Sequence, residues 1–168
     1  MPAIETERLL IRPFRRSDAE DAFEWRSDPE VNRFMPYPCD TDIAAFRQRI
    51  GEWIKEKDKF ALELKETGKV IGDISLEWSE KDKAYEIGYN INRRFWGRGY
   101  ATEAVSGLLD WATVEIGAHD FTAFYAMENG ASGRVLEKCG FRQEYTGRYS
   151  RNDGSEVFEA AFVRIHIE

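Results

Sequence analysis

Apolar residues recur along this chain with two different periods, and each period predicts one kind of secondary structure. Residues 43–54 carry apolar side chains at helical spacing, which predicts a helix that begins near Thr41 or Asp42. From residue 60 the period changes to two, and apolar and polar residues alternate over 60–65, 70–78 and 85–91. Three successive alternating runs predict an antiparallel meander.

Three further helices are indicated by capping signals and apolar faces. The sequence Ser-Asp-Ala-Glu at 17–20 has the form of a capping box, with Ser17 as cap and Glu20 reaching back. It predicts a short helix from about 18 to 27. An apolar face predicts a helix from about 101 to 116 that ends at Gly117, and residues 131–138 predict a short helix that ends at Gly140.

The remaining runs complete the order of elements. Residues 7–14 and 120–126 read as strands, and 141–167 as a hairpin that turns at Asp153-Gly154. The order is strand, two helices, three strands, helix, strand, helix and two strands. This order predicts an α+β fold with a mixed sheet, and 168 residues fit one domain over 1–168.

Composition and charge narrow the class of protein. With 42% hydrophobic residues the chain is globular, and no apolar run approaches the roughly 20 residues of a membrane span. The net charge of −7 disfavours nucleic acid, whose phosphates need Lys and Arg, and favours cationic partners such as amines. The first residues lack a signal pattern. Isolated Cys39, Cys139, His119 and His166 predict a reduced, cytoplasmic protein without a metal.

Residues 94–104, Arg-Phe-Trp-Gly-Arg-Gly-Tyr-Ala-Thr-Glu-Ala, put two glycines directly before a predicted helix. A helix N-terminus presents unpaired N–H groups, and glycines there let an anion approach the backbone, so this turn is a candidate phosphate site. A Walker loop is excluded because GK[ST] is absent, and Thr102 stands where the dinucleotide fingerprint has a third Gly or Ala. On these residues alone, an ordinary turn with solvated arginines is an equal alternative.

Four segments, in order, resemble one family. RFWGRGYA at 94–101 resembles the Arg/Gln-x-x-Gly-x-Gly/Ala signature of the GNAT acetyltransferases. ETERLLIRPFRRSDAEDAFEW at 5–25 is similar to the opening of the branch that contains the ribosomal-protein N-terminal (alanine/serine) acetyltransferases. AYEIGYNI at 84–91 resembles the fourth strand of that branch, and NGASGRVLEKCGF at 129–141 resembles its Asn-x-x-Ser helix followed by Gly-Phe. The resemblance covers nearly the whole chain.

The resemblance implies a fold and a cosubstrate. The fold is a mixed, mostly antiparallel sheet of about seven strands, with helices on both faces and a V-shaped splay between the fourth strand and the fifth. Acetyl-CoA lies in the splay, with its pyrophosphate on the amides of the glycine turn and its pantetheine arm along the fourth strand. The implied contacts are Ile87, Gly88, Tyr89, Asn90, Ile91, Arg94, Phe95, Trp96, Gly97, Arg98, Gly99, Tyr100, Ala101, Thr102, Asn129, Ser132 and Arg134. For Arg134 and Lys138, a solvated helix face is the alternative.

The implied reaction is direct attack of a primary amine on the thioester. An amine must lose a proton to attack, so a base is needed. Glu86 resembles the family's fourth-strand base; the alternatives are a polar residue on a wet sheet face, Glu77 as the base, or a chain of ordered water. The family's hairpin glutamate aligns with Ser150, which also favours Glu86.

Two further roles follow from the resemblance. Many members hold the leaving thiolate with a tyrosine seven residues after the helix asparagine, but Leu136 stands there, so Ser132 is assigned to the thiolate. The alternative for Ser132 is helix capping or packing. The oxyanion is assigned to a backbone N–H between Tyr89 and Ile91.

The acceptor is left open between a protein N-terminus and a small amine. Phe34, Met35 and Tyr37, in a proline-rich loop, are the candidate acceptor pocket. A non-catalytic acetyl-CoA sensor or partner protein is the alternative function, and exposed edge strands are compatible with a homodimer. Cys139 has no partner histidine in sequence, so no covalent cysteine route is expected.

Overall fold

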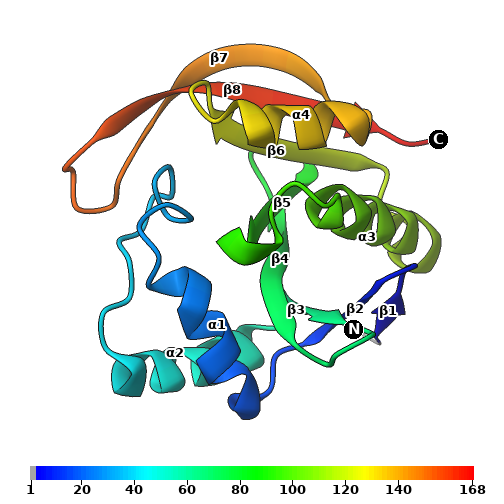
Figure 1. Ribbon diagram of the computed structural model, residues 1–168. Helices are drawn as coiled ribbons and strands as arrows, with labels where there is room; N and C mark the ends of the chain where they lie inside the picture. Colours follow the sequence, from blue (N-terminus) through cyan, green and yellow to red (C-terminus); the bar gives the residue numbers. More distant parts are fainter. Residues whose placement is uncertain (1–2) are drawn as a thin grey trace.

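A mixed sheet of eight strands organises the computed structural model, which describes residues 3–168 (Figure 1). Its order is β1-β2-β3-β4-β5-β6-β8-β7, and every neighbouring pair is antiparallel except β5 and β6. The strands are β1 (Ile4–Glu5), β2 (Leu9–Pro13), β3 (Lys59–Leu64), β4 (Val70–Ser79), β5 (Ala84–Ile91), β6 (Asp120–Ala126), β7 (Arg142–Ser150) and β8 (Val157–His166). The expected α+β fold is confirmed, and the additional strand is the two-residue β1.

The helices form two groups that build two hydrophobic clusters. They are α1 (Ala19–Arg26), α2 (Ile43–Glu56), α3 (Tyr100–Ile116) and α4 (Gly130–Lys138), with 3₁₀ turns η1 (Arg16–Asp18) and η2 (Arg93–Phe95). One cluster joins α3 and α4 to the strands, and the other joins α1 and α2 to residues such as Ala61 and Val70. Figure 1 shows the two groups apart from each other, with β3, β4 and β5 between them.

The predicted meander and helix α2 follow the sequence pattern closely. Strands β3, β4 and β5 pair antiparallel in succession, as the three alternating runs predict. Helix α2 buries Phe46, Ile50 and Trp53, and Asp42 caps it by accepting a hydrogen bond from the N–H of Ala44 at 3.0 Å. Burying an apolar stripe at this spacing is what holds an amphipathic helix against a sheet.

The capping box expected at Ser17 and Glu20 is wrong. Asp18 closes the turn instead, because its Oδ2 accepts a hydrogen bond from the N–H of Arg15 at 2.7 Å. The same carboxylate accepts hydrogen bonds from both terminal guanidinium nitrogens of the buried Arg12, at 2.8 and 2.9 Å. A buried guanidinium needs an anionic partner. The first turn is therefore the 3₁₀ turn η1, and α1 begins only at Ala19.

The splay between β5 and β6 is the feature that creates the site. The two strands pair only at Tyr85 with Phe121 and at Glu86 with Thr122. Beyond this point β5 stays paired with β4 as far as Ile91 but has no pairing with β6. The backbone of residues 87–91 therefore has one unpaired edge inside the molecule, and an unpaired edge needs hydrogen-bond partners.

Within residues 3–168, none of the helices has both the length and the apolar character needed to cross a membrane.

Candidate active site

A cavity of about 190 Å³ lies where β5 parts from β6. Its walls come from β3, β4, β5, β6, α4, the loop after α1 and the end of β7. Of the residues expected at the site, it is lined by Phe34, Met35, Tyr37, Glu77, Glu86, Ile87, Gly88, Tyr89, Asn90, Asn129 and Ser132. Ile91, the turn 94–102 and Arg134 do not line it, although Ile91 ends β5 and the turn follows directly after it.

Both faces of β5 reach this cavity because the strand is free on one edge. Along a strand, successive side chains point to opposite faces. Tyr89 contacts Ser132 of α4 on one face, whereas Asn90 contacts Tyr37 of the loop after α1 on the other. The cavity therefore has an α4 side and a loop side, and Glu86 belongs to the loop side by alternation with Asn90.

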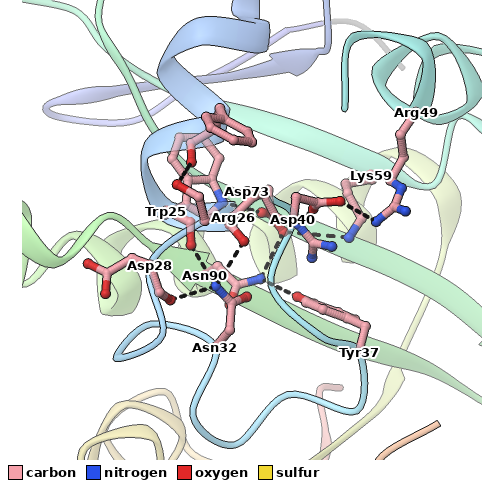
Figure 2. Close-up of polar contacts among 12 residues, drawn as sticks. Trp25, Arg26, Asp28, Asn32, Tyr37, Asp40, Arg49, Lys59, Asp73 and Asn90 are labelled. Atoms are coloured by element: carbon pink, nitrogen blue, oxygen red, sulfur yellow. Dashed lines mark hydrogen bonds and ion pairs between the residues drawn. The ribbon is translucent and has the colours of Figure 1, made fainter. Parts of the chain in front are cut away.

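The loop side is built around a buried carboxylate, as Figure 2 shows. Asp73 of β4 is only 2% exposed. The indole N–H of Trp25 donates to its Oδ2 at 2.9 Å, and the ammonium of Lys59 lies 3.7 Å from its Oδ1. Sequence reasoning missed Asp73. The available signal was an acid in the apolar first half of its strand, which implies a buried partner.

Asn90 connects this carboxylate to the acceptor loop. Its amide nitrogen donates to the Tyr37 hydroxyl at 2.9 Å and lies 3.4 Å from the Asp73 carboxylate. The ring of Tyr37 is held by the guanidinium of Arg26, 3.9 Å from the ring centre. The carbonyl oxygen of the Asn90 side chain is buried and has no partner among the described residues. That oxygen is an unused hydrogen-bond acceptor in the cavity wall.

Glu86 and Glu77 face each other across β4 and β5. Neither carboxylate forms an ion pair or a side-chain hydrogen bond with another residue in the described part of the chain, and Glu77 is the more exposed of the two. Burial raises the pKa of Glu86, and the negative charges of Glu77 and Asp82 raise it further. Burial and then Asp58 raise the pKa of Glu77. A carboxylate with a raised pKa holds a proton more readily, which suits a base.

A second cavity of about 140 Å³ also borders Glu86. It lies between the β4–β5 turn, where Asp82 lines it, and the outer strands, where Glu144 and Tyr145 do. The buried hydroxyl of Thr122, which has no partner among the described residues, lines it as well. Glu86 therefore stands between two cavities.

The α4 side carries a hydroxyl pair. The Tyr89 hydroxyl lies 2.8 Å from Ser132 Oγ and 3.2 Å from the Ser132 carbonyl oxygen. Burial raises the pKa of Tyr89, so its proton stays on the ring oxygen. Asn129 caps α4 by accepting a hydrogen bond from the Ser132 N–H at 3.3 Å. The cap is therefore Asn129, and the side chain of Ser132 turns to Tyr89, a contact that sequence reasoning missed.

The glycine turn has the geometry of a helix start with free amides. Gly97 and Gly99 have φ of 73° and 80°, a conformation that favours glycine. The first intrahelical hydrogen bond of α3 runs from the Glu103 N–H to the Gly99 carbonyl at 3.0 Å. The amides of Tyr100, Ala101 and Thr102 precede that bond, so the helix itself leaves them without partners.

An ion pair from the N-terminal segment holds this turn. Arg8 lies 2.7 Å from the Glu103 carboxylate and donates a second hydrogen bond to the Arg98 carbonyl at 2.8 Å. The Trp96 indole donates to the Ile91 carbonyl at 2.7 Å. Arg94 and Arg98 are exposed. The role of Arg8 was not foreseen, because nothing in the sequence links it to a turn some ninety residues away.

Comparison with known proteins gives the family. The family model described as an acetyltransferase (GNAT) domain matches residues 8–142. A relative in Bacillus subtilis, the uncharacterized N-acetyltransferase YnaD, is 33% identical over 96% of this chain and 95% of its own. A GNAT-family acetyltransferase from Bacillus anthracis has the same fold at a TM-score of 0.89 and 28% identity, over 98% of both chains.

More distant structures share the fold but differ in their acceptors. Spermidine N-acetyltransferase from Vibrio cholerae, in complex with CoA and spermine, matches at a TM-score of 0.78 and 17% identity, over 95% of both chains. Ribosomal-protein-S5-alanine acetyltransferase from Vibrio fischeri matches at 0.76 and 22% identity, over 99% of this chain and 97% of its own. The fold thus leaves the acceptor open. The family model and the Bacillus subtilis relative are sufficient to conclude that the chain belongs to the GNAT acetyltransferase family.

Proposed function

We propose that this chain transfers the acetyl group of acetyl-CoA to a primary amine by direct attack. The observation that carries the proposal is the splayed half of β5. One face of this strand presents Glu86 and the other presents the Tyr89–Ser132 pair, and both line one cavity. An amine and a thioester that meet there have a base on one side and a hydroxyl donor on the other.

Acetyl-CoA is proposed to occupy the α4 side. Its extended pantetheine arm pairs with the free edge of residues 87–91, as an added strand does. Its pyrophosphate binds at the amides of the glycine turn, where the start of α3 carries partial positive charge. Asn129 keeps its amide nitrogen for the arm, because its oxygen already caps α4. Exposed Arg134 lies on the first turns of α4 and is assigned to the distal phosphates.

In the proposed chemical step, Glu86 accepts a proton and the CoA thiolate is the leaving group. Glu86 takes a proton from the acceptor ammonium, either directly or through water, and its raised pKa narrows the gap to amine pKa values of about 8–10. The amine nitrogen then bonds to the thioester carbon, and a backbone N–H between Tyr89 and Ile91 stabilises the oxyanion. The C–S bond breaks, the nitrogen releases its remaining extra proton, and the leaving thiolate takes up that proton. The Ser132 hydroxyl, which Tyr89 orients, donates a hydrogen bond to the sulfur.

The acceptor enters on the loop side in this proposal. Phe34, Met35 and Tyr37 form that wall of the cavity, and the acidic lining suits an amine that arrives as a cation. The narrower assignment, to the ribosomal-protein N-terminal acetyltransferases, would require this entrance to admit a peptide. It is the less favoured alternative.

A two-stage experiment tests the function. First, thermal unfolding is followed with acetyl-CoA, CoA, NAD or ATP, and stabilisation by the two CoA species alone is expected. Second, release of the CoA thiol is followed with a panel of amines, with Glu86→Gln as the control. Stabilisation by ATP or NAD instead would contradict the proposal. CoA binding without thiol release with any amine would favour the alternative, a non-catalytic acetyl-CoA sensor or partner protein.

A further inference from the structure

The loop between α1 and α2 is fastened to the β7–β8 hairpin at consecutive backbone carbonyls. The carbonyl of Phe34 accepts a hydrogen bond from the Tyr149 hydroxyl at 2.6 Å. The carbonyls of Arg33 and Met35 accept hydrogen bonds from the guanidinium of Arg151 at 2.5 and 3.2 Å. The two segments are more than a hundred residues apart in sequence, so the fold itself joins them.

Further contacts join the same two segments, the loop after α1 and the β7–β8 hairpin. The carbonyl of Pro36 accepts a hydrogen bond from the backbone N–H of Asn152 at 2.7 Å. Arg33 forms an ion pair with Glu156 at 3.1 Å, and the ring of Phe34 packs on Phe158 with 5.8 Å between ring centres. We refer to residues 33–36, together with their hydrogen bonds to residues 149–152, as the strap. Each backbone carbonyl of residues 33–36 therefore already accepts a hydrogen bond.

The strap closes one wall of the cavity. Phe34, Met35, Pro36 and Tyr149 all line the cavity, so the wall consists of segments that are bonded to each other. A peptide acceptor gains affinity by pairing its backbone with free backbone groups, and the strap offers no free carbonyls. The closed strap therefore favours a small acceptor.

The charges that line the cavity favour a cationic acceptor with more than one positive group. Lys59 compensates Asp73, which leaves the facing Glu77 and Glu86 without partners among the described residues. If Glu86 takes the proton of the reacting amine, Glu77 still lacks a cation. Asn90, a residue that is 6% exposed and lines the cavity, adds a buried side-chain oxygen that has no partner in the described structure.

We propose that the acceptor is a small amine that carries a second cationic group, and that the strap excludes protein N-termini. The inference rests on the proposed function, because it concerns the acceptor of the same reaction. The reacting amine gives its proton to Glu86, while the second group binds at Glu77, which faces Glu86 across β4 and β5. A monoamine of equal length leaves the second position empty.

The test compares three acceptors with the full-length protein. Thiol release is measured with 1,4-diaminobutane, with butylamine and with a tetrapeptide that has a free N-terminal alanine. We expect kcat/KM to be at least about tenfold higher for the diamine than for butylamine, since bonds to a charged partner are among the strongest polar contacts. The peptide should be the poorest acceptor. Equal values for the two amines, or a preference for the peptide, would overturn the inference.

Two variants locate the second cationic group. In Glu77→Gln the diamine-to-butylamine ratio should fall towards one, mainly through a higher KM for the diamine. In Glu66→Gln, an exposed glutamate in the turn between β3 and β4, the ratio should stay at the wild-type value. A ratio unchanged by Glu77→Gln overturns the role of Glu77.

The outcomes also separate this inference from the proposed function. Thiol release with butylamine or the peptide, without preference for the diamine, overturns the inference and leaves the acetyltransfer reaction standing. No thiol release with any of the three acceptors, in protein that binds acetyl-CoA, counts against both.

Discussion

Two irregular segments flank the splayed half of β5, and they are held in place in different ways. The turn after β5 combines bonds among its own residues with one distant anchor, Arg8, which pairs with Glu103 and donates to the Arg98 carbonyl. The N–H of Phe95 donates to the Asn92 carbonyl, and the Trp96 indole donates to the carbonyl of Ile91, five residues earlier. The loop after α1 is held by the strap, whose donors Tyr149 and Arg151 belong to the far end of the chain.

This difference corresponds to the two halves of the proposed reaction. The turn is assigned to the part of acetyl-CoA that every acetyl transfer shares, and its local bonds let a short motif specify much of its shape, with Arg8 as the distant anchor. The loop is assigned to the acceptor, and its shape depends on a hairpin that can change independently of the motif. A fold built in this way keeps one cosubstrate site while its acceptor site varies. Four changes, taken from the largest expected effect to the smallest, test this separation.

Glu86→Gln should abolish most of the acetyl-transfer activity without changing acetyl-CoA binding at the turn. Loss of a general base lowers the rate by about 10²–10⁴, so kcat should fall by that range while the affinity for acetyl-CoA stays the same. Steady-state kinetics and a binding titration measure the two effects separately. An equal loss of acetyl-CoA affinity would mean that Glu86 is part of the cosubstrate site.

The pH profile of the wild-type protein sharpens this prediction. The base must be ionised to accept a proton, and its pKa is raised above the ordinary value of about 4.3. The rate should therefore fall as the pH drops through the raised pKa of Glu86 and recover as the pH rises. That limb of the profile should be missing in Glu86→Gln. If the variant keeps the limb, another group is the base, and Glu77 is the first to examine.

Gly97→Val should weaken acetyl-CoA binding and leave the acceptor side intact. Gly97 has φ of 73°, and a Cβ there meets no atom within 4 Å, so the cost is backbone strain and lost access to the turn amides. We expect a loss of affinity of about tenfold or more. The matched control is Gly68→Val, at the same φ and with the same open surroundings, in the turn between β3 and β4. The same loss of affinity in both variants would show that strain alone is responsible.

Arg151→Ala should loosen the loop and spare the turn. The change removes the two side-chain hydrogen bonds to the carbonyls of Arg33 and Met35. We expect a several-fold higher KM for the small acceptor, since each lost bond is worth about 1 kcal/mol, and faster amide hydrogen exchange within 31–37. The control is Arg148→Ala on β7, three residues before Arg151, which removes an exposed ion pair with Glu159. Unchanged exchange in the loop would show that Arg151 does not hold it.

Glu77→Gln should raise the melting temperature of the unliganded protein slightly at neutral pH. The folded state raises the pKa of Glu77, so its ionised form is less stable there than in the unfolded chain. The stabilisation by Gln should be present above the folded pKa and should vanish as the pH falls below the unfolded pKa, where wild-type Glu77 is protonated in both states. Melting curves at several pH values measure this. A lower melting temperature at neutral pH would mean that the Glu77 carboxylate has a stabilising partner.

Elements with a local pattern could be predicted from the sequence. The meander, α2 with its Asp42 cap, and the glycine turn before α3 all follow from residue spacing within one segment. The capping box is the exception, because Ser17 and Glu20 fit the local rule but Asp18 was taken by a buried arginine six residues earlier. A local signal fails when a distant or buried charge competes for the same group.

The sequence by itself determined the order of elements, the glycine turn and the acidic balance that favours an amine, because each is a property of neighbouring residues or of the total composition. Only the tertiary structure decided which groups meet: Tyr89 with Ser132, Asn90 with Tyr37, and Arg151 with the loop. A hydroxyl, an amide or a guanidinium can pair with many partners, and its sequence neighbourhood does not select among them. The splay of β5 from β6 brings the two sides of the site together, and it exists only in the folded sheet.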